Sequence, residues 1–206
     1  VMEYEEGYDL QESIRRHKGS LPEELIRTIF VPLLHGLAHI HGKGLLHLDI
    51  KPGNIYLRNG GDPILLDFGA VHQMQQSRQH QTSQVVTPGY SPIEQCTQGG
   101  YVGPWTDIYA MGASMRTCLE GHAPLAATER RIKDTMRPAV ETFRKTYSHS
   151  LLAAIDWAME IDPLLRPQNA DQLLEALAKE DPPPEEGNAG ESMFGRFAGS
   201  LPWNKG

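Results

Sequence analysis

The chain has 206 residues, enough for one domain with a sizeable core, and its hydrophobic content of 39% suits a globular protein. Its formal net charge of −7, from 19 Lys and Arg against 26 Asp and Glu, disfavours nucleic acids and anionic membranes as partners. The sequence has no visible signal peptide and no apolar run of the roughly 20 residues that span a bilayer, so we expect a cytoplasmic chain, although an anchor could lie beyond either end.

A long helix is the first element that the pattern predicts. It opens at residues 21–24, with Ser20 as its N-cap and Pro22 in its first turn, and it ends at Gly42 and Gly44. The apolar positions that recur at near-helical spacing are Leu25, Ile29, Leu33, Leu37 and Ile40.

A short β-hairpin is expected next, at about residues 55–66. Residues 55–57 and 64–66 are strand candidates, and the Gly- and Pro-containing stretch between them predicts a turn. The hairpin would bring Asn54, which precedes its first strand, alongside Asp67, which follows its second.

The second half of the chain is expected to be helical. A stretch rich in Gln, Ser and His, residues 72–86, lacks periodicity and is predicted to be a functional loop. After it we expect a buried helix over 108–119 and amphipathic helices over 151–159 and 170–177.

The composition changes near residue 181, where a Pro-rich acidic segment begins. We therefore divide the chain into a domain, 1–180, and a linker with a flexible tail, 181–206. The apolar islands of this tail, 193–197 and 201–203, are interpreted either as disordered sequence or as a short peptide that docks on a folded surface.

The side chains around the predicted hairpin suit phosphoryl transfer. The segment His-Leu-Asp-Ile-Lys-Pro-Gly-Asn, at 47–54, places Asp49, Lys51 and Asn54 in one loop, and Asp67 follows the hairpin. Transfer from ATP needs a carboxylate to accept the hydroxyl proton, a cation near the γ-phosphate, and oxygen ligands for Mg²⁺. These residues predict a site for ATP and Mg²⁺, with Mn²⁺ as an alternative metal.

Further motifs occur in an order that resembles a known family. They are Asp-Phe-Gly at 67–69, Thr-Pro-Gly-Tyr-Ser-Pro-Ile-Glu at 87–94, Trp-Thr-Asp-Ile-Tyr-Ala-Met-Gly at 105–112 and Asp-Pro-Leu-Leu-Arg-Pro at 162–167. Together with the 47–54 loop, the set resembles eukaryotic-type Ser/Thr protein kinases. The short loops and the acidic charge of the chain resemble those of bacterial members of that family. The resemblance implies a mostly α (α+β) fold, a protein-kinase-like C-lobe in which a helical bundle carries a short β-hairpin next to the catalytic loop.

The same resemblance implies that a lobe is missing. Residues 1–7 resemble the hinge between the two kinase lobes, and no glycine-rich loop or strand lysine precedes them. We therefore expect the large, C-terminal lobe without its N-terminal lobe, catalytically inactive by itself and able to self-associate through the exposed lobe interface.

The resemblance also implies a role for each motif residue. Asp49, Lys51 and Thr87 are expected to be catalytic, and Asn54 and Asp67 to be metal ligands. The expected ATP-binding residues are Met2, Glu3, Glu5, Asp9, Lys51, Asn54, Tyr56 and Asp67. Those expected to be structural are His47, Phe68, Glu94, Asp107 and Arg166, with Asp107 accepting hydrogen bonds from the catalytic-loop backbone and Glu94 paired with Arg166.

One departure from the family pattern concerns regulation. Most of these kinases have Arg where this chain has Leu48, and that Arg pairs with a phosphorylated activation-loop residue. Leucine cannot make a charge-assisted bond to phosphate, so the usual phosphate switch is not expected here.

The expected function is that of a Ser/Thr protein kinase, which transfers the γ-phosphate of ATP to Ser and Thr hydroxyls of protein substrates. The alternative is a pseudokinase, a kinase-like lobe that acts as a binding scaffold. The presence of Asp49, Lys51, Asn54 and Asp67 together favours the enzyme, because a scaffold has no chemical need for all of them.

Overall fold

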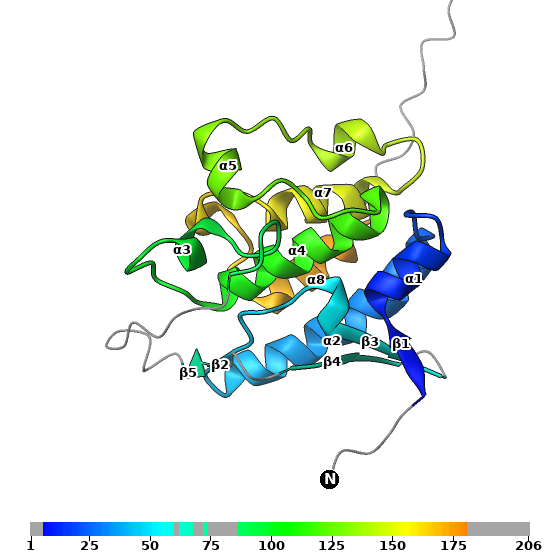
Figure 1. Cartoon of the computed structure of the whole chain (residues 1–206), viewed down its shortest axis with the longest axis horizontal. Coiled ribbons are helices and arrows are strands. Elements are labelled where there is room, and N and C mark those ends of the chain that lie inside the picture. The colour runs from blue at the N-terminus through cyan, green and yellow to red at the C-terminus, as the bar shows by residue number, and fades with distance from the viewer. Residues whose placement is uncertain (1–5, 60–61, 68–71, 74–85, 181–206) are drawn as a thin grey trace, which may run out of the picture.

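The computed structural model of this chain describes residues 6–59, 62–67, 72–73 and 86–180. Helices dominate these residues, and the strands form small antiparallel sheets (Figure 1). The expected mostly helical fold is therefore confirmed. The predictions that concern Met2, Glu3, Glu5, Phe68 and the 181–206 segment lie outside the described residues, as does most of the predicted 72–86 loop.

The helices enclose a single main core. They are α1 (Leu10–Arg16), α2 (Glu23–Gly42), α3 (Ile93–Cys96), α4 (Pro104–Glu120), α5 (Ala127–Ile132), α6 (Ala139–Thr142), α7 (His149–Ala158) and α8 (Ala170–Leu177), with short 3₁₀ helices η1 (Pro52–Asn54) and η3 (Pro163–Leu165). Every residue of α4 from Thr106 to Leu119 is buried, as is typical of a helix at the centre of a domain. In Figure 1 this helix lies between α5 and α6 above it and the strands below it.

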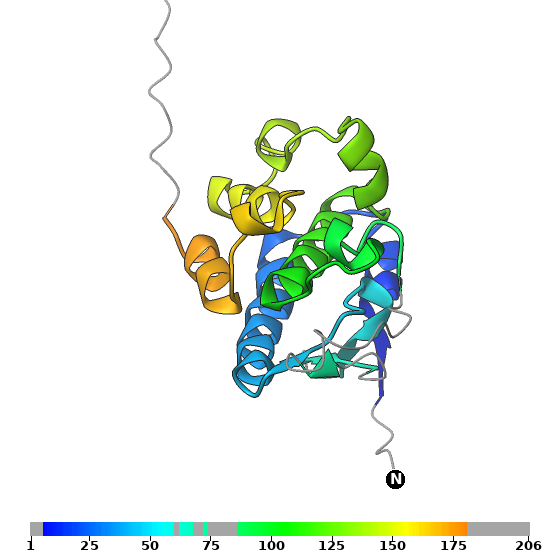
Figure 2. The same cartoon turned by 90° about the vertical axis from the view of Figure 1, so that its left-hand side faces the viewer.

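Helix α2 links the helical core to the sheet. Figure 2 shows α8 on one side of α2 and the strands on the other. The predicted apolar face is present, but the predicted N-cap is wrong. The helix begins at Glu23 after Pro22, without a side-chain cap, and the Ser20 hydroxyl instead lies 2.8 Å from the Tyr147 hydroxyl.

Arg27 ties the start of α2 to the last two helices. Its guanidinium donates to the Leu177 carbonyl at 2.6 Å and to the Ser148 and Ser150 hydroxyls at 3.0 Å, and its Nε donates to Glu23 at 2.7 Å. Burial raises the pKa of Glu23, but hydrogen bonds from Ser148 and Arg27 outweigh that effect and hold it below its usual value.

The larger sheet has the order β1-β3-β4 and contains the predicted hairpin. Its strands are β1 (Gly7–Asp9), β3 (Ile55–Arg58) and β4 (Pro63–Leu65), all antiparallel. Gly7 is required where β1 meets β3, because a Cβ there would lie 2.2 Å from the Leu57 carbonyl oxygen. A second pair, β2 (Leu45–Leu46) with β5 (His72–Gln73), was not predicted.

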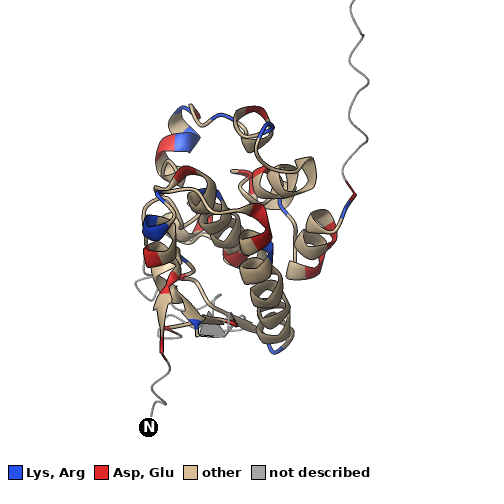
Figure 3. Cartoon of the chain, turned by 90° about the vertical axis from the view of Figure 1, so that its right-hand side faces the viewer, with Lys and Arg blue, Asp and Glu red and all other residues tan. Residues whose placement is uncertain are grey.

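Charged residues of both signs lie side by side at the α5–α6 end of the molecule (Figure 3). Arg130 contacts Asp134 at 2.9 Å, and Arg137 contacts Glu141 at 3.7 Å, each four residues apart.

Within the described part of the chain, none of the helices is both long enough and apolar enough to cross a bilayer.

Candidate active site

Four side chains converge at the end of the loop that precedes β3. The Asp49 carboxylate accepts hydrogen bonds from Lys51 Nζ, at 3.0 Å to Oδ1 and 2.8 Å to Oδ2. Thr87 Oγ1 donates to Asp49 Oδ1 at 2.9 Å, and Asn54 Nδ2 donates to Asp49 Oδ2 at 2.9 Å. Asp49, Lys51, Asn54 and Thr87 are therefore brought together, although Thr87 is 38 residues from Asp49 in the sequence.

These contacts fix the orientation of the Asp49 carboxylate, because each of its two oxygens accepts from two donors. Its side chain is 10% exposed, whereas that of Lys51 is 29% exposed. Each carboxylate oxygen has two lone pairs and already meets two donors, so an incoming hydroxyl would take the place of one of these contacts. Lys51 Nζ also lies 3.5 Å from Thr87 Oγ1, which places a cation and a hydroxyl on the same side of the carboxylate.

His47 joins this loop to the end of the hairpin. Its side chain is fully buried, as predicted, with Nε2 3.1 Å from the Leu66 carbonyl oxygen and Nδ1 3.3 Å from the Asp49 amide nitrogen. A neutral imidazole protonated on Nε2 satisfies both contacts, because it donates to Leu66 and accepts from Asp49. These contacts connect the backbone at Asp49 to the carbonyl group that precedes Asp67.

Asp107, near the start of α4, anchors the backbone of the same loop. Its fully buried carboxylate accepts from the amides of His47 at 2.9 Å and Leu48 at 2.8 Å, as expected. His41 Nε2, from the last turn of α2, lies 2.8 Å from Asp107 Oδ2. The sequence analysis did not identify His41 as a partner, and the proximity of two helix ends is not visible in a local pattern.

Leu48 has an unusual backbone conformation. Its φ angle of 64° lies in the left-handed region, which costs a residue with a side chain roughly 1–2 kcal/mol. Its side chain packs in a small buried cluster with Leu46 and Val102, and its carbonyl oxygen accepts a hydrogen bond from Gln95 Nε2 at 2.6 Å. The residue that replaces the usual arginine is therefore enclosed by apolar neighbours and offers no donor to a phosphate.

The two predicted metal ligands lie at the open end of the hairpin. The Leu66 amide donates to the Asn54 carbonyl at 2.8 Å, so β3 and β4 place Asn54 beside the residue that precedes Asp67. The Asn54 side-chain nitrogen donates to Asp49, so the oxygen is the atom of this amide that could serve as a ligand to a cation. Asp67 is exposed. An amide oxygen and an exposed carboxylate suit Mg²⁺, which prefers a few protein oxygens together with phosphate and water.

A metal centre made by protein side chains alone does not occur in the described part of the chain, where no three His, Cys, Asp or Glu side chains are grouped to hold an ion. The amide oxygen of Asn54 and the carboxylate of Asp67 are of the kind that share Mg²⁺ with the phosphates of a nucleotide.

Asp9 and Tyr56, both predicted to bind ATP, face each other in the register between β1 and β3. Asp9 also has a local role that the sequence analysis missed. Its Oδ1 accepts from the Glu12 amide at 2.7 Å and caps α1. The signal was present in the sequence, because Asp followed three residues later by Glu is typical of a helix start.

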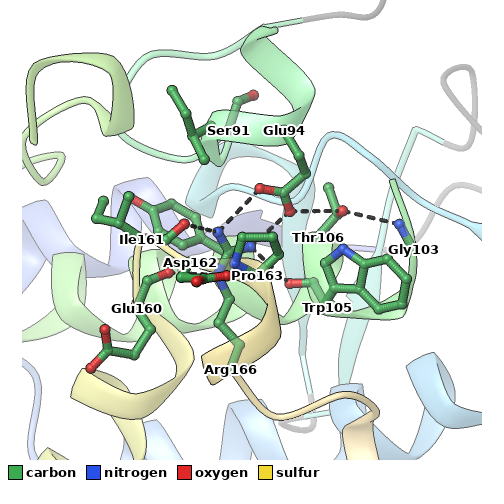
Figure 4. A network of polar contacts seen from close by, with 12 residues as sticks. Ser91, Glu94, Gly103, Trp105, Thr106, Glu160, Ile161, Asp162, Pro163 and Arg166 are labelled. Atoms are coloured by element: carbon green, nitrogen blue, oxygen red, sulfur yellow. Dashed lines mark hydrogen bonds and ion pairs between the residues drawn. The ribbon is translucent and has the colours of Figure 1, made fainter. Parts of the chain in front are cut away.

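The predicted pair of Glu94, in α3, and Arg166, directly after η3, is buried (Figure 4). Two nitrogens of Arg166 contact the two oxygens of Glu94 at 2.7 and 3.1 Å, and Thr106 Oγ1 donates to Glu94 at 3.0 Å. The Gly103 amide donates to that Thr106 hydroxyl, and the guanidinium lies 4.8 Å from the centre of the Tyr109 ring. Arg166 also donates to the carbonyls of Trp105, Glu160 and Ile161.

Comparisons with known proteins identify the family of this chain. The family model described as "Protein kinase domain" matches residues 1–184, and this match begins at the first residue. The serine/threonine-protein kinase PknA of Nostoc sp. is 35% identical over 188 residues, which cover 86% of this chain and 32% of that protein. Mitogen-activated protein kinase kinase 3 of Arabidopsis thaliana is 30% identical over 179 residues, or 84% of this chain and 34% of that protein.

A solved structure, the apo form of PpkA-294, has a TM-score of 0.73 and 35% sequence identity to this chain. The match covers 85% of this chain and 61% of that one. The chain belongs to the protein kinase family. It spans about a third of the length of the curated relatives given above.

Proposed function

We propose that this chain carries the catalytic-loop and metal-binding residues of a Ser/Thr protein kinase. Such an enzyme transfers the γ-phosphate of ATP to Ser and Thr hydroxyls of proteins. The observation that carries the proposal is the arrangement of Lys51, Thr87 and Asn54 around the Asp49 carboxylate. Phosphoryl transfer depends almost entirely on positioning and electrostatics, and these contacts supply both around one proton acceptor.

Each residue has a separate task in this proposal. Asp49 orients the substrate hydroxyl and accepts its proton late in the transfer, and Lys51 stabilises negative charge on the transferred group. Asn54 and Asp67 hold Mg²⁺, which when bound neutralises charge on the ATP phosphates. Thr87 contacts both Asp49 and Lys51, and this contact favours Ser and Thr over Tyr as the accepting residue.

We also propose that the nucleotide needs a second group of residues that the 206-residue sequence lacks. It contains no glycine-rich loop of the kinase type and no Val-Ala-Ile-Lys strand. Asp9 and Tyr56, together with the hinge residues Met2, Glu3 and Glu5, would supply one side of the ATP site. The 206-residue chain alone is then inactive and binds Mg-ATP weakly. Calorimetric titration tests this point, and micromolar affinity would contradict it.

The catalytic assignment is tested in the full-length protein with Asp49→Asn and Asp67→Asn. Both variants should lose phosphotransfer from radiolabelled ATP to a protein substrate while they keep the wild-type circular dichroism spectrum. Asp62→Asn, in the exposed hairpin turn, is the matched control and should keep full activity. Undiminished transfer by either active-site variant would refute the assignment. An inactive wild-type protein that still binds Mg-ATP would instead support the scaffold alternative.

A further inference from the structure

Among the described hydrogen bonds, that of Gln95 is the one that connects a side chain of α3 to the loop at 47–54. Gln95 is 5% exposed, and its Nε2 donates to the Leu48 carbonyl at 2.6 Å. Neither the ATP site nor the metal site proposed above uses this residue. The contact joins segments 47 residues apart in the sequence.

The peptide that Gln95 holds is the one that leads into Asp49. Leu48 is held on its amide side by Asp107, at 2.8 Å, and on its carbonyl side by Gln95. Between these two contacts it adopts a φ angle of 64°. Because a left-handed conformation is unfavourable for leucine, it persists only where its surroundings determine it. The two hydrogen bonds and the packing of Leu48 against Leu46 and Val102 provide those surroundings.

Gln95 adjoins a buried ion pair. It follows Glu94, whose carboxylate is fixed by Arg166 and Thr106. The backbone that carries Gln95 is therefore anchored beside the buried ion pair.

We propose that Gln95 is a positioning residue, which holds the Leu48–Asp49 peptide in its left-handed geometry and so aims the Asp49 carboxylate without an activation-loop phosphate. This inference rests on the proposed kinase function. It identifies a neutral hydrogen bond, in addition to the Asp107 contacts, as one that orders the loop in a chain whose Leu48 cannot bind phosphate.

The test is Gln95→Met in the full-length protein, which keeps the side-chain length and removes the donor. Misplacement of a reacting group by about 1 Å can cost about 100-fold in rate, so kcat should fall by about 10- to 100-fold. The KM for Mg-ATP should not change, because the Leu48 carbonyl that Gln95 binds belongs to none of the proposed ATP-binding residues. Gln98→Met, the same replacement at an exposed position three residues further on, should keep kcat within about twofold.

A second variant, Gln95→Glu, is closer to Gln95 in shape and gives a different readout. The new carboxyl can donate to Leu48 only when it is protonated, and burial should raise its pKa. Its kcat relative to the wild type should therefore rise as the pH is lowered from about 8 to about 6. No such rise is expected for Gln95→Met.

Hydrogen–deuterium exchange separates this inference from the kinase assignment, because it does not require activity. In Gln95→Met the amides of Leu48 and Asp49 should exchange faster, while those of α4 should not. Unchanged exchange in the 47–51 loop, or a kcat within twofold of the wild type, would overturn the proposal. A wild-type protein without kinase activity but with the expected exchange difference would refute only the proposed function.

Discussion

Replacing Arg166 with Met should strongly destabilise the 206-residue chain. Arg166 has a fully buried side chain and supplies both ion-pair contacts to Glu94, whose side chain is 6% exposed. After the replacement, the Glu94 carboxylate keeps the Thr106 hydroxyl as its described donor. The three carbonyl groups that Arg166 serves would also lose a donor.

Removing one partner of a buried ion pair typically costs about 3–5 kcal/mol, because the other charge remains buried without compensation. Methionine fills most of the volume of the arginine stem, so the loss comes chiefly from the stranded charge and carbonyls. For a domain of this size, 1 kcal/mol corresponds to about 2–4 °C, which gives a decrease in Tm of about 6–20 °C.

Urea denaturation followed by circular dichroism measures this loss as a change in the free energy of unfolding. Arg137→Met is the control, because Arg137 forms an exposed pair with Glu141 at 3.7 Å and should change the stability by less than about 1 kcal/mol. In a double-mutant cycle with Glu94→Gln, the double variant should lose less than the sum of the single losses. A loss below about 1 kcal/mol for Arg166→Met, or simple additivity, would refute the reasoning.

Further predictions concern pH, thiol reactivity and phosphate. Because the pKa of Glu23 is lowered in the folded chain, the stabilisation that Glu23 provides is present above its ordinary pKa of 4.5 and is lost as the pH falls through the lowered value. The difference in urea midpoint between wild type and Glu23→Gln should therefore shrink between neutral pH and about pH 3. A constant difference would contradict this expectation. Burial strongly raises the pKa of the Cys118 thiol, so mass spectrometry should find Cys118 unmodified after iodoacetamide treatment of the native chain and modified after unfolding; native labelling would be the opposite result. Because Leu48 is enclosed by apolar side chains, phosphatase treatment of the full-length protein should leave its initial rate nearly unchanged. A tenfold loss of rate, which corresponds to about 1.4 kcal/mol, would show that another cation binds an activation-loop phosphate.

Elements with a repeated apolar pattern could be predicted from the sequence. The helices α2, α4, α7 and α8 and the β3–β4 hairpin occur where periodicity and turn residues indicate them. The strands β2 and β5 have two residues each, which is too short for any period to be detected. Their pairing depends on chain segments that meet only in the folded domain.

The residues at and around the site also divide into those that a local sequence pattern indicates and those that it does not. Asp49, Lys51 and Asn54 lie within six residues of one another, so their spacing alone indicates a common task. Ser20 was predicted from a local capping rule, yet its hydroxyl bonds to Tyr147, 127 residues away. Gln95 has no local pattern at all, because its partner is a backbone carbonyl, which every residue possesses.

The anchoring of the catalytic loop by later parts of the chain has a consequence for protein synthesis. The Asp107 carboxylate follows the Leu48 amide that it binds by 59 residues, and Gln95 follows Leu48 by 47. A ribosome adds about 5–20 residues per second, so roughly 3–12 s pass between the synthesis of Leu48 and that of Asp107. Until Gln95 has been added, the left-handed conformation of Leu48 has no support from either anchor, and until Asp107 has been added its amide lacks a partner from α4. A nascent chain therefore carries Asp49 in a loop without both anchors until α4 has left the ribosome, so the arrangement proposed for phosphotransfer can form only when the helical core folds.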